Sequence, residues 1–266
     1  MSTSRDQIDN ITRSSLYNSR GIELAERGWL DEAIKQFKHA IRITPNDAQG
    51  YDNLGTVYAD KGQLLEALAS YTKALALEPD SSAALHNLGC FLANHANQLA
   101  VHCFESAYRL EPDFFESRFN LGLCMAAEDK HEQALAHFEA ALPISNFDPE
   151  IRYHLALSLM ELNLNKRAIN EFNIVVREQE NNDAAWYHLG HCYHKQGILS
   201  EAEVSYIKAI QRNPKNIEAV LALASLYKSQ KRDREARSYV KRALNLDRKY
   251  ALDAIALDEH LCQETY

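Results

Sequence analysis

Small and aromatic side chains recur along the chain with a period of about 34 residues. Alanine stands at seven positions that are 33 or 34 residues apart, namely Ala33, Ala67, Ala100, Ala134, Ala168, Ala202 and Ala236. Four residues later come Phe37, Tyr71, Phe104, Phe138, Phe172, Tyr206 and Val240. A glycine or alanine precedes each alanine by twelve residues, with a one-residue shift in the third unit, at Gly21, Gly55, Gly89, Gly122, Ala156, Gly190 and Ala224. Recurrence in constant phase predicts a chain built from tandem structural repeats.

Each period predicts two amphipathic helices joined by a tight turn. In the second period, Tyr51, Leu54 and Tyr58 fall on one face of a first helix. Gly62 ends that helix, and Pro79 ends the second one because proline cannot continue a helix. The small residues let the two helices approach closely, and the aromatic ring fills the space beside them.

The pattern resembles the tetratricopeptide repeat, W-x2-L-G-x2-Y followed by A-x3-F, A and P. The sixth period carries it as Trp186, Leu189, Gly190, Tyr193, Ala202, Tyr206, Ala209 and Pro214. Seven such repeats start near residues 14, 48, 82, 115, 149, 183 and 217. The resemblance implies an all-α fold, a right-handed superhelical solenoid of antiparallel helix pairs. In such a stack each repeat touches only its neighbours, and the first helices line a concave surface.

The expected organisation is one solenoid over residues 14–250, with a polar lead-in over 1–13 and a capping helix and tail over 251–266. Two departures from the pattern interrupt it. The third repeat lacks the glycine between its helices, and Pro143 should end the second helix of the fourth repeat about a turn early. We therefore expect a local change of stacking at 142–150.

Composition narrows the class of protein. The chain has 266 residues, a formal net charge of −8 and 46% hydrophobic residues, with an alanine- and leucine-rich apolar set that favours helix. The N-terminus has no apolar signal region, and no apolar run approaches the roughly 18 residues that span a bilayer. Five cysteines without a CxxC pair predict reduced, mostly buried thiols and a cytoplasmic protein.

Sequence motifs of catalysis are missing. The chain has no glycine-rich phosphate loop, no G-x-S-x-G and no H-E-x-x-H, and an open stack provides no desolvated pocket. We expect no enzyme and no cofactor. The predicted function is a non-enzymatic protein–protein interaction scaffold, or adaptor, that binds an extended peptide in its concave groove.

Helical phase directs the second, fifth, sixth, ninth and twelfth places of each first helix toward that groove. The sixth place holds Asn53, Asn87 and Asn120 in succession, then His154 and His188. The three asparagines are similar to the ladder in the repeat superhelix of O-GlcNAc transferases. That similarity implies that they hold a peptide backbone, for which an amide offers both a donor and an acceptor. The ladder ends where histidine begins.

Aromatic residues follow at the fifth place, as Phe119, Tyr153 and Tyr187. Rings at the centre of a groove are good hot spots for binding, although they could equally pack against neighbouring first helices as core. The predicted peptide-binding residues are Asn53, His86, Asn87, Phe119, Asn120, Tyr153, His154, Tyr187, His188 and His191.

The segment "WYHLGHCYHKQG" raises a metal-site alternative, since His188, His191 and His194 are spaced three residues apart on one helix. A transition metal usually requires three or four converging ligands, and Cys192 lies outside the phase toward the adjacent helix. We predict no metal site. A metal or small-molecule sensor is the weakest alternative function.

Charge limits the choice of partner. Lysine and arginine are absent from the positions that form a carboxylate clamp around Asn53 or Asn87, which argues against a chaperone tail. Residues 228–249 hold nine basic and three acidic residues, a net of +6 that leaves −14 for the rest of a chain of −8. This stretch is a solvated outer face, a docking patch for an acidic partner, or a surface for self-association. The main alternative function is accordingly a structural assembly protein that self-associates through its terminal repeats. Nucleic acid is not expected as a partner.

Overall fold

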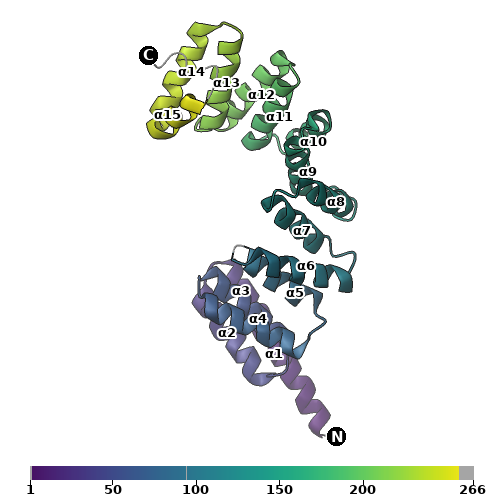
Figure 1. Ribbon diagram of the computed structural model, residues 1–266. Coiled ribbons are helices and arrows are strands. Elements are labelled where there is room, and N and C mark those ends of the chain that lie inside the picture. Colours follow the sequence, from purple (N-terminus) through teal and green to yellow (C-terminus); the bar gives the residue numbers. More distant parts are fainter. Residues whose placement is uncertain (1, 94, 258–266) are drawn as a thin grey trace. The chain divides into compact units, whose positions relative to one another are not determined.

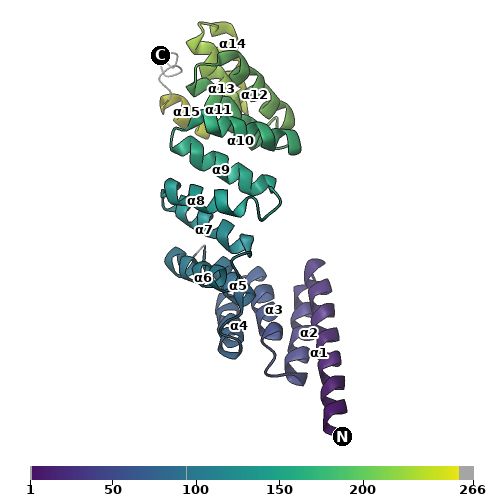
Figure 2. The same ribbon diagram turned by 90° about the vertical axis from the view of Figure 1, so that its right-hand side faces the viewer.

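The computed structural model describes residues 2–93 and 95–257, with the side chains of residues 9–93 and 95–252. Every regular element in these ranges is an α-helix (Figures 1 and 2). The helices are α1 (Ser2–Glu26), α2 (Leu30–Ile43), α3 (Ala48–Asp60), α4 (Leu64–Leu77), α5 (Ser82–Ala93), α6 (Asn97–Leu110), α7 (Phe115–Ala127), α8 (His131–Ala141), α9 (Pro149–Glu161), α10 (Asn165–Glu178), α11 (Asp183–Lys195), α12 (Leu199–Arg212), α13 (Ile217–Ser229), α14 (Asp233–Leu246) and α15 (Arg248–Leu257). The predicted all-α solenoid of helix pairs is confirmed.

The repeat starts read from the sequence coincide with helix starts. First helices begin at Ala48, Ser82, Phe115, Pro149, Asp183 and Ile217, the six positions predicted for repeats two to seven. The first repeat differs because α1 already begins at Ser2, so the polar residues 2–13 continue the first helix. The 34-residue pattern therefore sets both the number of hairpins and their boundaries.

The chain forms two compact units, Met1–Cys124 and Met125–Tyr266, which divide within α7. In each unit, first helices contact the next first helix as well as their own second helix. These contacts join α1, α3 and α5 in the first unit, and α9, α11 and α13 in the second. First helices therefore lie side by side along one side of each unit.

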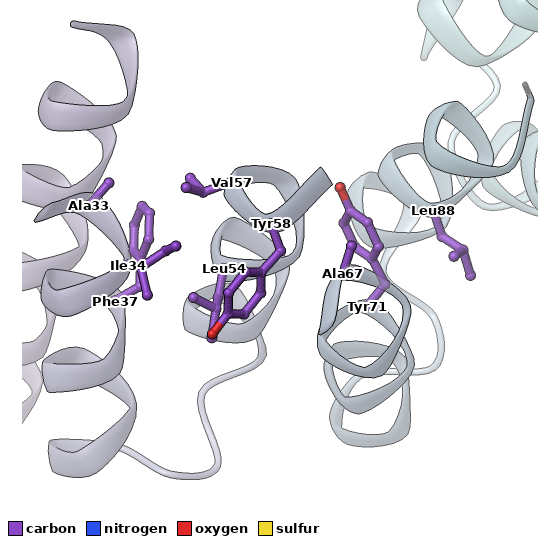
Figure 3. Packing of buried hydrophobic residues seen from close by; sticks show 9 residues of the cluster. All are labelled: Ala33, Ile34, Phe37, Leu54, Val57, Tyr58, Ala67, Tyr71 and Leu88. Carbon is purple, nitrogen blue, oxygen red and sulfur yellow. The ribbon is translucent and has the colours of Figure 1, made fainter. Parts of the chain in front are cut away.

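The core of the first unit is built from the residues that define the repeat. Figure 3 shows Ala33, Ile34, Phe37, Leu54, Val57, Tyr58, Ala67, Tyr71 and Leu88, which come from α2, α3, α4 and α5. A Cβ atom at Gly55 would lie 2.8 Å from ring carbons of Tyr71. Only glycine permits this approach of α3 to the ring, which explains why the glycine and the ring recur together.

The turn between the two helices of a repeat contains a residue in the left-handed region. Gly28, Gly62 and Gly197 have φ angles of 78°, 72° and 72°. Three other repeats place a different residue there, with φ of 58° at Asp129, 58° at Asn163 and 59° at Lys231. Spacings of 34 residues make these positions equivalent, so the packing of the two helices imposes the conformation whatever the residue.

The end of the fourth repeat departs from the others. The helix α8 has 11 residues, whereas α6 and α10 have 14, and Pro143 follows its end as expected. The chain then turns through Asn146 and Phe147, both with positive φ, and α9 starts at a cap in which the Asp148 side chain accepts from the Glu150 N–H. Since α8 still contacts α9, the change of stacking at 142–150 stays a prediction.

The C-terminal helix α15 contacts α13 and α14, and Ala251 is fully buried there. The Tyr250 hydroxyl donates to Glu218 Oε1 at 3.1 Å. Residues 258–262 of the expected capping helix lie outside the described residues. Of the helices in the described ranges, none has the length and apolar character needed to cross a membrane.

Thiol burial is mixed among the four cysteines that the structure describes. Cys124 and Cys192 are buried, Cys103 is half-buried and Cys90 is exposed; none of these four forms a disulfide. Cys262 lies outside the described residues. The prediction of free thiols is confirmed for these four, but burial holds fully for only two of them.

Candidate peptide-binding surface

One face of the first helices remains accessible in each unit. We call the residues at the second, fifth, sixth and ninth places the first-helix stripe. In the first unit it comprises Ser15, Asn18, Ser19, Ile22, Gln49, Asp52, Asn53, Thr56, Ala83, His86, Asn87, Cys90, Glu116, Phe119, Asn120 and Leu123. In the second unit it comprises Glu150, Tyr153, His154, Leu157, Ala184, Tyr187, His188, His191, Glu218, Leu221, Ala222 and Ser225.

All ten predicted peptide-binding residues lie on this stripe, and all ten are half-buried. Their partial exposure follows from helical phase, because the seventh and eighth places, such as Leu54 and Gly55, are buried against the second helix. The sequence prediction of which residues would be accessible together is thus matched within each unit. Whether they bind a peptide is a separate question.

A polar contact joins successive first helices in the first unit. The Asn87 Nδ2 group donates to Asp52 Oδ2 at 2.7 Å, linking the sixth place of α5 to the fifth place of α3. The other carboxylate oxygen, Asp52 Oδ1, is buried and has no hydrogen-bond partner among the described residues. Burial raises the pKa of Asp52, and the bond from Asn87 only partly opposes this shift.

The three asparagines of the predicted ladder occupy different environments. The donor of Asn87 is already engaged by Asp52, whereas Asn53 Nδ2 is buried without a partner in the described part of the chain. The Asn120 Nδ2 group lies 3.6 Å from Cys90 Sγ, which is a weak acceptor. Only Asn53 and Asn120 therefore have an amide donor that is free or weakly engaged.

His86 supports the stripe from within. Its Nδ1 atom lies 2.9 Å from Ser117 Oγ, and its ring packs against Phe104 and Phe114 at centroid distances of 5.5 and 4.8 Å. Burial lowers the pKa of His86, so the ring is neutral near pH 7. These contacts tie α5 to α7, where Phe119 is half-buried on the same stripe.

Rings replace the polar contact in the second unit. Tyr153 meets His188 edge-on at 6.1 Å, which joins the fifth place of α9 to the sixth place of α11. His188 is also stacked on Phe172, with centroids 5.9 Å apart and planes inclined by 14°. Burial lowers the pKa of His188 to about 4, so this histidine behaves as a neutral aromatic ring.

The neighbouring rings continue the same cluster. His154 packs against Phe138 at 6.1 Å, and Tyr187 lies 6.1 Å from Tyr206. Burial lowers the pKa of His154 and raises the pKa of Tyr187. The predicted aromatic stripe is thus half in the core and half at the surface, which combines the two alternatives that the sequence left open.

The histidines of α11 do not converge as metal ligands. His188 is held in the ring cluster, and His191 Nδ1 is buried without a hydrogen-bond partner in the described ranges. Burial also lowers the pKa of His191. Within the described residues, no three histidine, cysteine or acidic side chains come close enough together to hold a metal ion.

Each unit has an open cavity on its surface. The cavity of the first unit measures about 370 Å³ and lies at the N-terminal ends of α3 and α5, beside the first-helix stripe. Its lining is Asp47, Ala48, Gln49, Asp52, Asn53, Glu78, Ser81, Ala83 and Ala84. A cavity of about 240 Å³ in the second unit lies between α10, α11 and α12, away from the stripe, and includes Trp186, Tyr193 and Val204.

Sequence reasoning missed Asp52. Its fifth place on α3 was a sufficient signal that it faces the same side as Asn53. Its partner could not be read, because the bond to Asn87 spans 35 residues and depends on how α3 and α5 stack.

Comparison with known proteins identifies the family. Models described as "Tetratricopeptide repeat" or "TPR repeat" match residues 21–62, 55–95, 91–149, 184–216 and 217–250. The chain belongs to the tetratricopeptide repeat family, whose members are typically non-catalytic interaction modules. Together with the fold, this defines a protein-interaction scaffold.

Particular relatives share parts of the chain. Anaphase-promoting complex subunit 3 of Schizosaccharomyces pombe is 28% identical over 140 residues, which make up 52% of this chain and 21% of that protein. The chain therefore spans about a fifth of the length of this relative.

Solved structures agree on the fold. YrrB, described as a TPR protein with an unusual peptide-binding site, has a TM-score of 0.60 at 21% identity, covering 69% of this chain and 96% of its own. A TPR repeat-containing protein of Cytophaga hutchinsonii has a TM-score of 0.70 at 18% identity, covering 88% and 98%. At these identities the likeness concerns the fold alone.

Proposed function

We propose that the chain is a non-enzymatic adaptor whose first-helix stripe binds an extended segment of a partner protein. The observation that carries this proposal is the half-buried state of all ten predicted residues. The framework residues of the repeat are consumed in the core, yet these side chains remain partly accessible next to one another. A half-buried polar or aromatic side chain loses little further freedom when a ligand covers it, which favours binding.

The two units offer different contacts to such a segment. In the first unit, the amides of Asn53 and Asn120 can pair with peptide N–H and C=O groups. In the second, the exposed edges of Tyr153 and Tyr187 offer apolar contact area at a small cost in side-chain entropy. His86 and His188 hold these groups in place through their ring contacts.

The relatives are consistent with a protein ligand. One similar structure is described as having a peptide-binding site, and one curated relative is a subunit of a multiprotein complex. These properties belong to those proteins, and we carry over only the class of ligand.

Site-specific photocrosslinking tests the proposal. Benzoylphenylalanine replaces Tyr187 in one variant and Leu65, an 81% exposed residue of α4, in a control. In native lysate, position 187 is expected to crosslink a partner protein and position 65 is not. Addition of Tyr153→Ala to the position-187 variant should reduce the crosslink severalfold, with an unchanged helical circular dichroism spectrum.

The result that contradicts the proposal is equal crosslinking from both positions, or none from position 187. Either outcome would show that the stripe is not the surface in contact with partners.

Self-association through the terminal repeats stays an alternative prediction. Two of the basic residues in 228–249 are engaged in ion pairs, since Lys228 pairs with Asp233 and Arg232 pairs with Glu203 and Glu235. Arg234 and Lys241 are exposed on α14. Light scattering across a hundredfold range of concentration decides the matter, because a constant monomer mass removes this alternative.

A further inference from the structure

We propose that the stripe of the first unit selects a peptide segment with a lysine or arginine side chain, which Asp52 receives. The inference rests on the proposed function and specifies the chemistry of its ligand.

The charge along the stripe is one-sided. The sixteen stripe positions of the first unit hold no lysine and no arginine, and their carboxylates are Asp52 and Glu116. His86 adds no positive charge at neutral pH, because burial lowers its pKa. A cationic ligand side chain would therefore meet no like charge from the stripe itself.

Cations of the same unit are held elsewhere by named contacts. Lys38 of α2 lies over the Tyr58 ring at 5.6 Å, and Lys73 of α4 lies over the Tyr51 ring at 5.9 Å. Lys61 forms an ion pair with Asp31. None of these three pairs with Asp52, whose hydrogen bond comes from the neutral amide of Asn87.

Asp52 is consequently an incompletely satisfied carboxylate. Its Oδ2 atom accepts one bond, while its Oδ1 atom is buried and accepts none within the described residues. A buried charge with neither a counter-ion nor a full set of donors is costly, and a cation that reaches it is bound strongly. Asn87 holds the carboxylate in a fixed orientation, so a ligand would not have to order it.

A second unpaired acceptor lies on the preceding repeat. Asn18, at the fifth place of α1, is 4% exposed, and its Oδ1 atom has no hydrogen-bond partner in the part of the chain described. That oxygen would lie 3.7 Å from a Cβ atom added at Gly50, in the first turn of α3. Two successive fifth places, Asn18 and Asp52, thus present buried acceptors that lack a donor.

The adjoining cavity has room for the side chain. Its volume of about 370 Å³ lies within the range of ligand pockets, roughly 300–1,000 Å³. Asp47, Asp52 and Glu78 line it, and no lysine or arginine does. Asp47 already accepts from the Gln49 N–H at 3.1 Å as a helix cap, which leaves Asp52 as the main acceptor for a ligand cation.

Pools of labelled peptides test the inference with the full-length protein. Fluorescein-labelled nonapeptides carry random Ala, Ser, Gln and Val residues around a central arginine, citrulline or aspartate. Citrulline has nearly the shape of arginine without its charge. By fluorescence anisotropy, the arginine pool should bind at least tenfold more tightly than the citrulline pool, and the aspartate pool most weakly.

The variant Asp52→Asn removes the charge while its amide oxygen can still accept from Asn87, so the stripe should keep its structure. It should lower the ratio of arginine to citrulline affinity at least fivefold. The matched control is Glu66→Gln, the same change of charge at an exposed residue of α4, which should leave the ratio unchanged.

Two outcomes separate the proposals. Equal binding of the arginine and citrulline pools, or an unchanged ratio in Asp52→Asn, overturns the selection of a cation while peptide binding stands. Absence of binding by every pool contradicts the proposed function and this inference together.

Discussion

The contact between the fifth place of one repeat and the sixth place of the next is polar in the first unit and aromatic in the second. Asn87 donates to Asp52 at 2.7 Å in the first, and Tyr153 meets His188 at 6.1 Å in the second. The two pairs occupy equivalent positions on first helices that are in contact. The repeat sets where a side chain stands, and the residue type alone decides what chemistry appears there.

The two contacts differ in what they contribute to stability. A pair of rings stabilises by about 0.5–1.5 kcal/mol beyond its buried area. The polar pair leaves Asp52 Oδ1 without a donor, so it contributes less to folding than a fully satisfied pair would. The first unit therefore retains unsatisfied polar groups that a ligand can use, whereas the second presents ring edges.

The turns differ in the same way. Within the first unit Gly28 and Gly62 hold the left-handed position, while in the second unit Asp129, Asn163 and Lys231 do so beside Gly197. Glycine adopts this conformation without strain, and other residues carry a cost of about 1 kcal/mol or more. Helix packing in the second unit evidently tolerates that cost.

The largest effect is expected from pH at His188. Its pKa is about 4 in the folded chain against 6.5 ordinarily, so the unfolded chain takes up the proton first as pH falls. The stability contributed by the neutral ring is complete above pH 6.5 and is lost between pH 6.5 and 4, a change of about 3 kcal/mol. His188→Phe keeps the ring and removes the proton, so urea unfolding at pH 4 and 7.5 should show a loss that is smaller by about 3 kcal/mol.

The control is Tyr153→Phe, which alters the same ring pair without removing a group that titrates in this range. It should leave the pH-dependent loss as it is in the parent chain. An equal loss in His188→Phe and the parent would mean that His188 is not held neutral by burial, and the aromatic side of the comparison would fail.

A smaller effect is expected from Asn87→Ala in the first unit. The substitution leaves the Asp52 carboxylate without its only hydrogen-bond donor from the described residues, which should cost about 2 kcal/mol of unfolding free energy. In an Asp52→Ala background the same substitution should cost at least about 1 kcal/mol less, because the two residues are coupled. Urea unfolding of the four chains measures this coupling, and strictly additive effects would show that the polar contact does not form.

The smallest effect is expected from Lys231→Gly in the last turn. Glycine relieves the strain of φ 59°, while its greater freedom in the unfolded chain offsets part of the gain. The net stabilisation should be about 0.5–1 kcal/mol, seen as a rise in the thermal midpoint. Gly62→Ala is the converse in the first unit and should lower the midpoint; a rise there would contradict the assignment of strain to these turns.

Much of the fold could be predicted because the repeat is written in the spacing of residues. The starts at Ala48, Ser82 and Ile217 followed from the 34-residue period, and Pro143 correctly indicated a shorter α8. Helical phase also predicted which stripe would be accessible, since the buried framework of each repeat leaves only one such face on a first helix.

What the sequence by itself determined was the number of hairpins, their boundaries and the set of residues that share the stripe, because helical periodicity and helix-ending residues act over short distances. Only the tertiary structure decided that Asn87 turns to Asp52, that His188 becomes a neutral ring on Phe172, and that Lys231 adopts a left-handed turn. Each of these depends on how helices from separate segments stack, and burial and partners at that contact are set by packing rather than by any local pattern.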